Sequence, residues 1–283
     1  MARKLPYSLL LMLCVSCAEA AQSGYIGFDR NIYPGDKALP LLHKTFQYTS
    51  YWLNNPPGTN VNSWKGKRAL LKQNGFGFLV LFNGRLEAAL GSVDARAATK
   101  GTADGKAAAA AAAREGFARG VLIFLDQEEG GRLTPPQAAY LFAWVDAVRA
   151  AGDRAGVYCS GIMVTDESGP ISTALDIAQR EAGRAKAGKS AESLSIWIAN
   201  DACPPSPGCT VQRPALSAGV PDLPLVHVSV WQYAQSPRRK EFTAQCPKNY
   251  APDGNCYAPG MPQGATSFID LNVADSADPS EMP

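Results

Sequence analysis

Four acidic side chains in this sequence lie at or near the ends of short apolar runs, and their types and spacing suit acid–base chemistry. Asp29 closes the run GYIGFD, and Asp270 lies in SFIDLN. The segment FLDQEEG carries Asp126 and Glu128, which are two residues apart. Side chains two apart on a strand point the same way, so these two can share one face while Gln127 points elsewhere. A group of carboxyls at strand ends is therefore the first candidate for a site.

Carboxyl groups gathered in this way suit the hydrolysis of a glycosidic bond. The leaving oxygen needs a proton from an acid of raised pKa, and the cation that grows on the sugar needs a nearby carboxylate. Crowding several carboxylates keeps one of them protonated near neutral pH. Glu128 has the longer reach and is the expected general acid, with Asp126 stabilising the cation or orienting a substrate acetamido group. Asp29 and Asp270 would tune pKa values, position water or bind sugar hydroxyls, and Glu129 is the alternative acid if the strand ends one residue later.

Aromatic and polar side chains near the same strand ends are candidates for binding a sugar. Aromatic rings can stack on the apolar faces of sugar rings, although the same residues commonly fill cores. An aspartate at a strand end also commonly caps the following loop, so the joint arrangement is what favours a site. The aromatic candidates are Tyr51, Trp52, Trp197, Trp231 and Tyr233, and the polar candidates are Asn83 and Arg85.

The elements that must position these residues form a repeated pattern, in which a short apolar run is usually followed by a helix. Near-continuous apolar strands between helices indicate a parallel sheet that is buried on both faces. The eight runs are 24–29, 45–52, 76–83, 120–126, 155–160, 194–200, 226–233 and 266–271. A chain of this length suits one barrel of ~250 residues. The sequence therefore predicts a single-domain α/β fold, an irregular (β/α)8 TIM-type barrel with the acidic residues at one mouth.

Helix signals are clear in the first part of the chain and fade in the last. Thr134 can cap a helix that starts at Pro135 and ends at Gly152. A second helix is expected over 64–74, and an outer, Ala-rich helix over 106–114 after a loose loop at 101–105. Residues 201–225 and 234–265 are rich in Pro and Gly and carry no clear helix pattern, so the last helices are predicted to be shortened or missing.

The first twenty residues have the pattern of a signal peptide. Arg3 and Lys4 precede the apolar run 9–15, and Ala18-Glu19-Ala20 offers a cleavage site. The run is shorter than the ~20 apolar residues that a spanning helix needs. We therefore expect a secreted or cell-envelope protein without a transmembrane segment, a barrel over 21–273 and a flexible tail over 274–283. Lipidation at Cys17 is a weaker alternative.

The cysteines of the exported part allow two local disulfides. Cys203 and Cys209 bracket one Pro/Gly loop, and Cys246 and Cys256 bracket another; the alternative is that all thiols are free. Cys159 lies in an apolar run and is expected to be a buried free thiol.

Composition excludes several other classes of function. The chain has two histidines, so neither a metal site nor a cofactor is expected, and a formal net charge of +2 does not fit a nucleic-acid binder. A hydrolase that uses Cys159 and His227 is disfavoured because no nucleophile elbow surrounds the cysteine. A monomer that acts on a glycan is the expected state.

Several short motifs, in this order, resemble glycoside hydrolase family 25, the lysozymes with an irregular β/α barrel. They are GFD at 27–29, the D-x-E at 126–128, AGVYCSG at 155–161, IWIAN at 196–200, WQY at 231–233 and IDLN at 269–272. The resemblance implies that Asp29, Asp126, Glu128 and Asp270 form an acidic site with Glu128 as the acid. It also implies cleavage between N-acetylmuramic acid and N-acetylglucosamine, with substrate-assisted attack by the acetamido group.

The first half of the chain departs from that pattern. The segments FQYTSYWLNNPPG and GFGFLVLFNGR are more similar to the glycoside-hydrolase-like barrels known as domain of unknown function 1906. Two functions are therefore expected side by side. One is a secreted glycosidase acting on peptidoglycan or a related amino-sugar polymer, and the alternative is a non-catalytic carbohydrate-binding barrel, which would bind the glycan without turnover.

Overall fold

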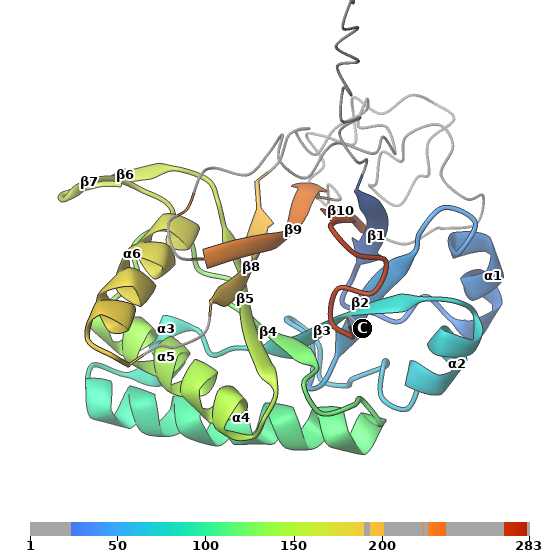
Figure 1. The fold of residues 1–283 in the computed structure, drawn as a ribbon, viewed down its shortest axis with the longest axis horizontal. Helices are drawn as coiled ribbons and strands as arrows, with labels where there is room; N and C mark the ends of the chain where they lie inside the picture. Colours follow the sequence, from blue (N-terminus) through green and yellow to red (C-terminus); the bar gives the residue numbers. More distant parts are fainter. Residues whose placement is uncertain (1–23, 190–192, 201–222, 224–225, 236–268, 282–283) are drawn as a thin grey trace, which may run out of the picture.

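The computed structural model describes residues 24–189, 193–200, 223, 226–235 and 269–281. Eight of the strands in these ranges close into a barrel in the order β1-β2-β3-β4-β5-β8-β9-β10 (Figure 1). They are β1 (Tyr25–Asp29), β2 (Tyr48–Trp52), β3 (Gly77–Asn83), β4 (Leu122–Asp126), β5 (Arg154–Ser160), β8 (Leu194–Ala199), β9 (Val226–Ala234) and β10 (Asp270–Ala274). The predicted α/β fold, a single domain built on an irregular TIM-type barrel, is confirmed.

Several sequence predictions fall on residues outside the described ranges. They are the signal segment 1–20, the cysteine pairs Cys203/Cys209 and Cys246/Cys256, and most of the segments 201–225 and 234–265. Cys159 is described, and it is the buried free thiol that the sequence predicts. Among the described helices, none is both long enough and apolar enough to cross a membrane.

The last strand runs against the predicted direction. β10 pairs antiparallel with both of its neighbours, β1 and β9, whereas the other pairs in the barrel are parallel. It also starts later than the predicted run 266–271, so Asp270 begins the strand instead of ending it. An antiparallel strand starts at the barrel end where its neighbour finishes and needs no crossover helix. Asp270 therefore still lies opposite Asp29, at the same mouth.

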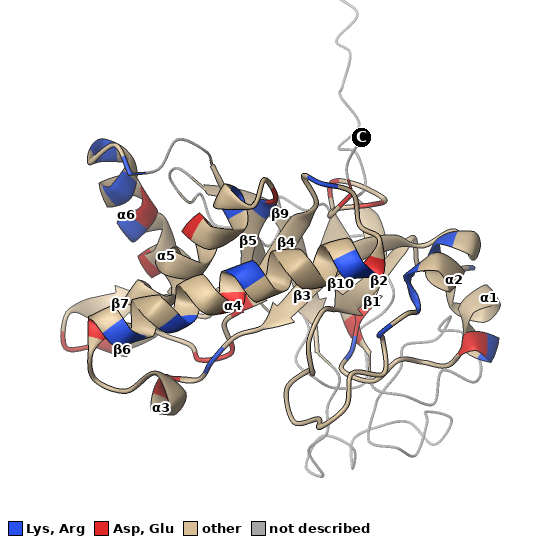
Figure 2. Cartoon of the chain, turned by 90° about the horizontal axis from the view of Figure 1, so that it is seen from below, with Lys and Arg blue, Asp and Glu red and all other residues tan. Residues whose placement is uncertain are grey.

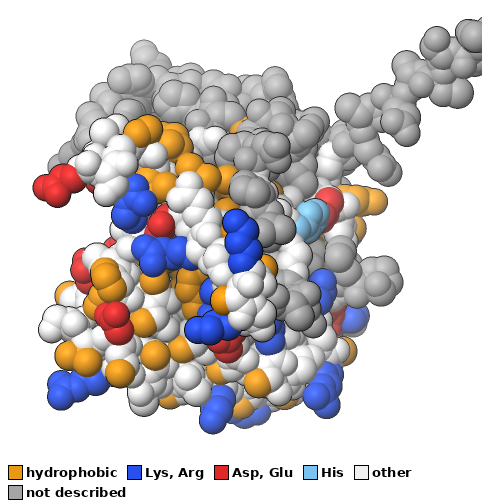
Figure 3. All heavy atoms as spheres, turned by 60° about the vertical axis from the view of Figure 1, so that its left-hand side comes forward, with side chains coloured by type: hydrophobic (Ala, Val, Ile, Leu, Met, Phe, Trp, Pro, Cys, Tyr) orange, Lys and Arg blue, Asp and Glu red, His pale blue; other side chains and the backbone are white. Residues whose placement is uncertain are grey.

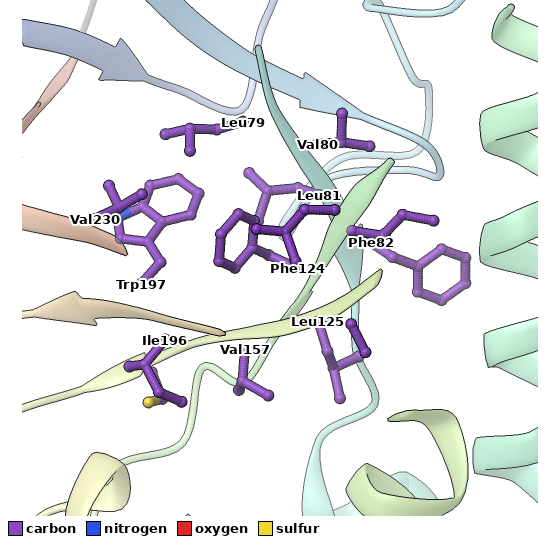
Figure 4. Packing of buried hydrophobic residues seen from close by; sticks show 14 of the residues in the cluster. Leu79, Val80, Leu81, Phe82, Phe124, Leu125, Val157, Ile196, Trp197 and Val230 are labelled. Atoms are coloured by element: carbon purple, nitrogen blue, oxygen red, sulfur yellow. The ribbon is translucent and has the colours of Figure 1, made fainter. Parts of the chain in front are cut away.

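Side chains alternate between the barrel interior and the surrounding layer, as the pleat requires. Leu81, Phe124 and Trp197 point toward one another inside the barrel (Figure 4), and the last two rings meet edge to face with centroids 5.8 Å apart. Phe82 points outward, where its ring lies 6.4 Å from that of Trp144 in the helical layer. A shift of one residue along a strand therefore moves a side chain between two different environments.

The helical layer is uneven around the barrel. Its elements are η1 (Asp36–Ala38), α1 (Leu39–Leu42), α2 (Arg68–Gln73), α3 (Glu87–Leu90), α4 (Asp94–Glu115), α5 (Pro135–Ala150) and α6 (Thr173–Lys186), with a hairpin of β6 (Val164–Asp166) and β7 (Gly169–Ile171). The predicted start of α5 is confirmed, since Thr134 and Gln137 form a reciprocal capping box ahead of Pro135. On the face turned forward in Figure 3, charged side chains of both signs lie among apolar ones.

The long helix α4 corrects the prediction of a loose loop at 101–105. Gly101 and Gly105 lie inside the helix, on the side that packs against α5. A Cβ atom at Gly101 would lie 2.1 Å from the carbonyl oxygen of Tyr140, and one at Gly105 would lie 2.6 Å from that of Trp144. The glycines thus allow the two helices to approach closely, while charged residues of both signs are spread along α4 (Figure 2).

A substitution at this contact tests the close approach. Gly101→Ala is expected to lower the free energy of unfolding by about 1–3 kcal/mol, because the added methyl group overpacks the contact. Gly183→Ala is the matched control, since Gly183 is exposed on α6 with no neighbouring atom within 4 Å of a Cβ. It should gain about 0.5–1 kcal/mol from the better helix former. Urea unfolding measures both, and stabilisation by both substitutions would refute the packing argument.

The segment after β10 differs from the predicted flexible tail, because residues 275–281 pack at the barrel end opposite the mouth. The Phe78 amide donates to Asp278 at 3.0 Å and the Val80 amide donates to the Ser280 hydroxyl at 2.9 Å. Glu281 forms an ion pair of 2.6 Å with Arg68 of α2. These bonds satisfy backbone groups that would otherwise be orphaned near the start of β3.

Candidate active site

A cavity of about 210 Å³ opens at the mouth of the barrel, where the parallel strands end. The four acidic residues singled out from the sequence, Asp29, Asp126, Glu128 and Asp270, all line it. Asp29 is the last residue of β1 and pairs with Asp270, the first residue of β10. Asp126 is the last residue of β4, and Glu128 follows two residues later. The fold therefore brings together carboxyl groups from three strand ends.

Asp126 is the most deeply buried of the four, with 3% of its surface exposed. Neither of its carboxyl oxygens has a hydrogen-bond partner among the described residues. Burial raises its pKa well above the usual value, and the nearby charges of Glu128 and Asp29 raise it further. A buried, unpartnered carboxyl is stable only as the neutral acid. The surroundings of Asp126 therefore favour its protonated form.

Asp29 is also buried but has two hydrogen-bond donors. Its Oδ2 atom accepts from the side-chain amide of Asn272 at 2.7 Å and from that of Gln232 at 2.9 Å. Burial raises the pKa of Asp29 to about 6, the two amide hydrogen bonds oppose the rise, and the charge of Glu128 adds to it. Because donors stabilise the charged form, Asp29 ionises more readily than Asp126, which has no donor among the described residues.

Glu128 and its neighbour Glu129 occupy different environments. Glu128 lines the cavity while much of its surface faces solvent, and burial of its carboxyl group against the wall raises its pKa. Glu129 does not line the cavity. Its Oε2 atom accepts from the backbone amide of Glu87 and from the side chain of Gln137, each at 2.7 Å. This carboxylate joins α3 to the start of α5, and of the two glutamates only Glu128 lines the cavity.

Among the aromatic candidates, the pleat decides which reach the cavity. Trp197 and Trp52 line it, whereas Tyr51 is fully buried on the outer side of β2 and its hydroxyl donates to Glu115 of α4. Trp231 and Tyr233 pack against each other outside the cavity lining.

The two polar candidates also lie elsewhere. The side-chain amide of Asn83 donates to the backbone oxygen of Asn55 at 2.9 Å, in the loop that follows β2, and its backbone amide donates to Oδ1 of Asn54 at 2.8 Å. Arg85 forms a 2.6 Å ion pair with Asp104 of α4. Both side chains hold loops and helices in place.

Other cavity residues were not singled out from the sequence. They are Arg30, Asn31, Leu81, Tyr158 and Gln235. Arg30 and Asn31 directly follow Asp29, so their position after a strand end was the available signal. Tyr158 lies within an apolar strand, where the sequence pattern does not distinguish it from a core residue. In the described part of the chain, no group of three or more His, Cys, Asp or Glu residues is arranged to hold a metal ion.

Residues 57–203 match the family described as Rv2525c-like, glycoside hydrolase-like domain. An uncharacterized protein of B. stearothermophilus is similar in structure, with a TM-score of 0.58 and 18% identity over 89% of this chain and 96% of that chain.

Two further structures are more distant. The Tat-secreted protein Rv2525c of Mycobacterium tuberculosis has a TM-score of 0.46 and 13% identity over 88% of this chain and 95% of its own. A bacterial lysozyme from Streptomyces coelicolor has a TM-score of 0.46 and 13% identity over 90% and 94%. No curated protein matches the sequence.

Proposed function

This chain belongs to the family of Rv2525c-like, glycoside hydrolase-like domains, and on that premise we propose that it is an exported glycosidase acting on peptidoglycan or a related amino-sugar polymer. The observation that carries the proposal is the buried, unpartnered carboxyl of Asp126 in a cavity that it shares with Asp29 and Glu128. An orphaned buried carboxyl is costly to the fold. A fold that keeps one beside two other carboxyls has the features expected of acid–base chemistry.

The environments of the three carboxyls assign their roles. Glu128, whose pKa is raised and which reaches solvent, donates its proton to the glycosidic oxygen as the bond to the anomeric carbon breaks. Asp29, held by two amide donors, is the anion that stabilises the cation growing on the sugar. Neutral Asp126 orients the acetamido group by hydrogen bonding. Water then adds to the anomeric carbon and returns a proton to Glu128.

The wall of the cavity supports a sugar as the occupant. Trp52 and Trp197 contribute apolar ring surface, and Asn31, Gln235 and Asp270 contribute polar groups to the same lining. A small number of polar groups on a partly aromatic wall is the usual composition of such sites. We propose that Asp270 binds sugar hydroxyls or positions the attacking water.

Release of reducing ends from purified peptidoglycan by the purified mature protein tests this function. The double variant Asp126→Asn/Glu128→Gln serves as the background, because it keeps the shape of the site and removes its acids. Release by the wild type above this background supports a glycosidase. Binding of wild-type protein to the insoluble glycan without release would support the non-catalytic barrel instead, and neither release nor binding would reject the substrate class.

Export is a separate part of the proposal. The signal pattern of residues 1–20 supports it, and N-terminal sequencing of the protein recovered outside the cytoplasm should then begin at Ala21.

A further inference from the structure

The side-chain amide of Asn272 has only one orientation that satisfies its neighbours. Its Oδ1 atom accepts from the indole nitrogen of Trp197 at 2.9 Å, and an indole N–H can only donate. Its Nδ2 atom also points at the backbone oxygen of Asp270 at 3.4 Å, and a carbonyl oxygen can only accept. Rotating the amide would therefore place donor against donor and acceptor against acceptor. Asn272 is left with a donor, and no acceptor, for Asp29.

The second amide that reaches Asp29 is held in a similar way. Gln232 accepts at Oε1 from the Tyr158 hydroxyl at 2.9 Å and from the side-chain amide of Gln235 at 3.0 Å. Its Nε2 atom donates to the same Asp29 oxygen, Oδ2. Tyr158 can also accept a hydrogen bond, so this half of the network is adjustable, whereas the half that contains Trp197 is fixed.

We propose that Trp197 is a positioning residue which, through Asn272, keeps Oδ2 of Asp29 a permanent acceptor, so that Asp29 binds and releases its proton only at Oδ1. The described residues give Oδ1 no hydrogen-bond partner. Trp197 itself lines the cavity, so the residue that would contact a bound sugar also fixes, through Asn272, the hydrogen bonding of Asp29. The inference rests on the proposed function, in which Asp29 is the anion, because it explains how Asp29 is selected for that role among the carboxyls of the cluster.

Other groups act on Asp29 from every side of the barrel. They are Asp126 at the end of β4, Glu128 two residues later, Asp270 on β10, Tyr158 on β5, Tyr48 on β2 and Arg30 directly after β1. A change in any of their charges would move the titration of Asp29. A test must therefore alter the fixed amide and leave these groups in place.

Trp197→Phe is such a change, because it removes the indole N–H and keeps an aromatic ring. Only the longer contact to the Asp270 backbone oxygen, at 3.4 Å, then holds the Asn272 amide, so it can turn its oxygen toward a protonated Asp29 and stabilise the neutral form. The midpoint of the Asp29 titration should rise by about 0.5–1 pH unit, followed by the carboxyl 13C signal of labelled aspartate and assigned by its loss in Asp29→Asn. Trp231→Phe is the matched control, since that indole donates to the backbone oxygen of Asn200 at 2.7 Å.

A measurement on the wild type guards against a variant that does not fold. The indole N–H resonance of Trp197 should shift with the same midpoint as Asp29, and that of Trp231 should not. The proposal is overturned if the Trp197 resonance does not follow the titration of Asp29. It is also overturned if Trp197→Phe shifts the Asp29 midpoint no more than Trp231→Phe does. Neither measurement needs substrate, so an inactive protein that shows these shifts would reject the glycosidase and keep the positioning role.

Discussion

Replacement of Glu128 by glutamine should lower the rate of reducing-end release from peptidoglycan by about 10²–10⁴-fold, the usual contribution of a general acid. Glutamine keeps the size of the side chain but has no acidic proton to give to the leaving oxygen. The loss should appear in kcat more than in KM, because proton donation acts in the transition state. Steady-state kinetics on a soluble glycan fragment would separate the two.

Glu129→Gln is the matched control, since it makes the same change one residue away. Glu129 accepts from the Glu87 amide and from Gln137 and lies outside the cavity lining. Glutamine there should leave kcat within a few-fold of the wild type and weaken the link between α3 and α5. Loss of activity in Glu129→Gln with activity retained in Glu128→Gln would move the proton donor to Glu129.

Asp29→Asn should be inactive yet more stable than the wild type at neutral and alkaline pH. Burial raises the pKa of Asp29 to about 6 in the folded protein, against 3.8 for the free side chain. The folded state therefore binds the proton more tightly, and stability is lost as the pH rises from the unfolded pKa through the folded one. A rise of this size corresponds to about 3 kcal/mol above pH 7. Asparagine removes the ionisation, and its oxygen can still accept from Asn272 and Gln232.

Urea unfolding at pH 3.5 and pH 8 would measure this effect. The difference between Asp29→Asn and the wild type should be near zero at the lower pH and largest at the higher one. Glu167→Gln removes an exposed carboxylate at the tip of the β6–β7 hairpin and should show no such trend. A difference between Asp29→Asn and the wild type that is the same at both pH values would mean that Asp29 ionises without cost in the folded state.

Local patterns predicted much of the fold and part of the site. All eight barrel strands appear near the predicted runs because buried strands are nearly continuous apolar segments. Asp29, Asp126 and Glu128 reach one cavity because strand ends meet at one mouth of a barrel. The family match confirms the expected glycoside-hydrolase-like barrel.

The remaining features depend on contacts between distant residues. An apolar run reads the same for either strand direction, so the antiparallel course of β10 was not visible. Glycine lowers helix propensity, and only the approach of α5 explains Gly101 inside α4. Successive side chains of a strand point to opposite faces, and the sequence does not show which face a residue at a strand end takes. Trp52 lines the cavity, whereas Tyr51 points away from it. Asn272 belongs to the motif IDLN, but its contacts to Trp197 and Asp29 depend on residues that are distant in the sequence.

The pairing of β1 with β10 has a consequence for the order of folding. The hydrogen bond from Asn272 to Asp29 joins residues 243 positions apart, so the barrel closes through a contact of very high sequence separation. Closing so large a loop costs entropy before the contact repays it, and such contacts slow folding. The acidic cluster therefore acquires its final pattern of protonation only when the two outermost strands meet. In a chain whose β1 and β10 have not yet paired, the carboxyl groups are present but are not held together in the cavity. Enzymatic activity during refolding would therefore report the closure of the barrel.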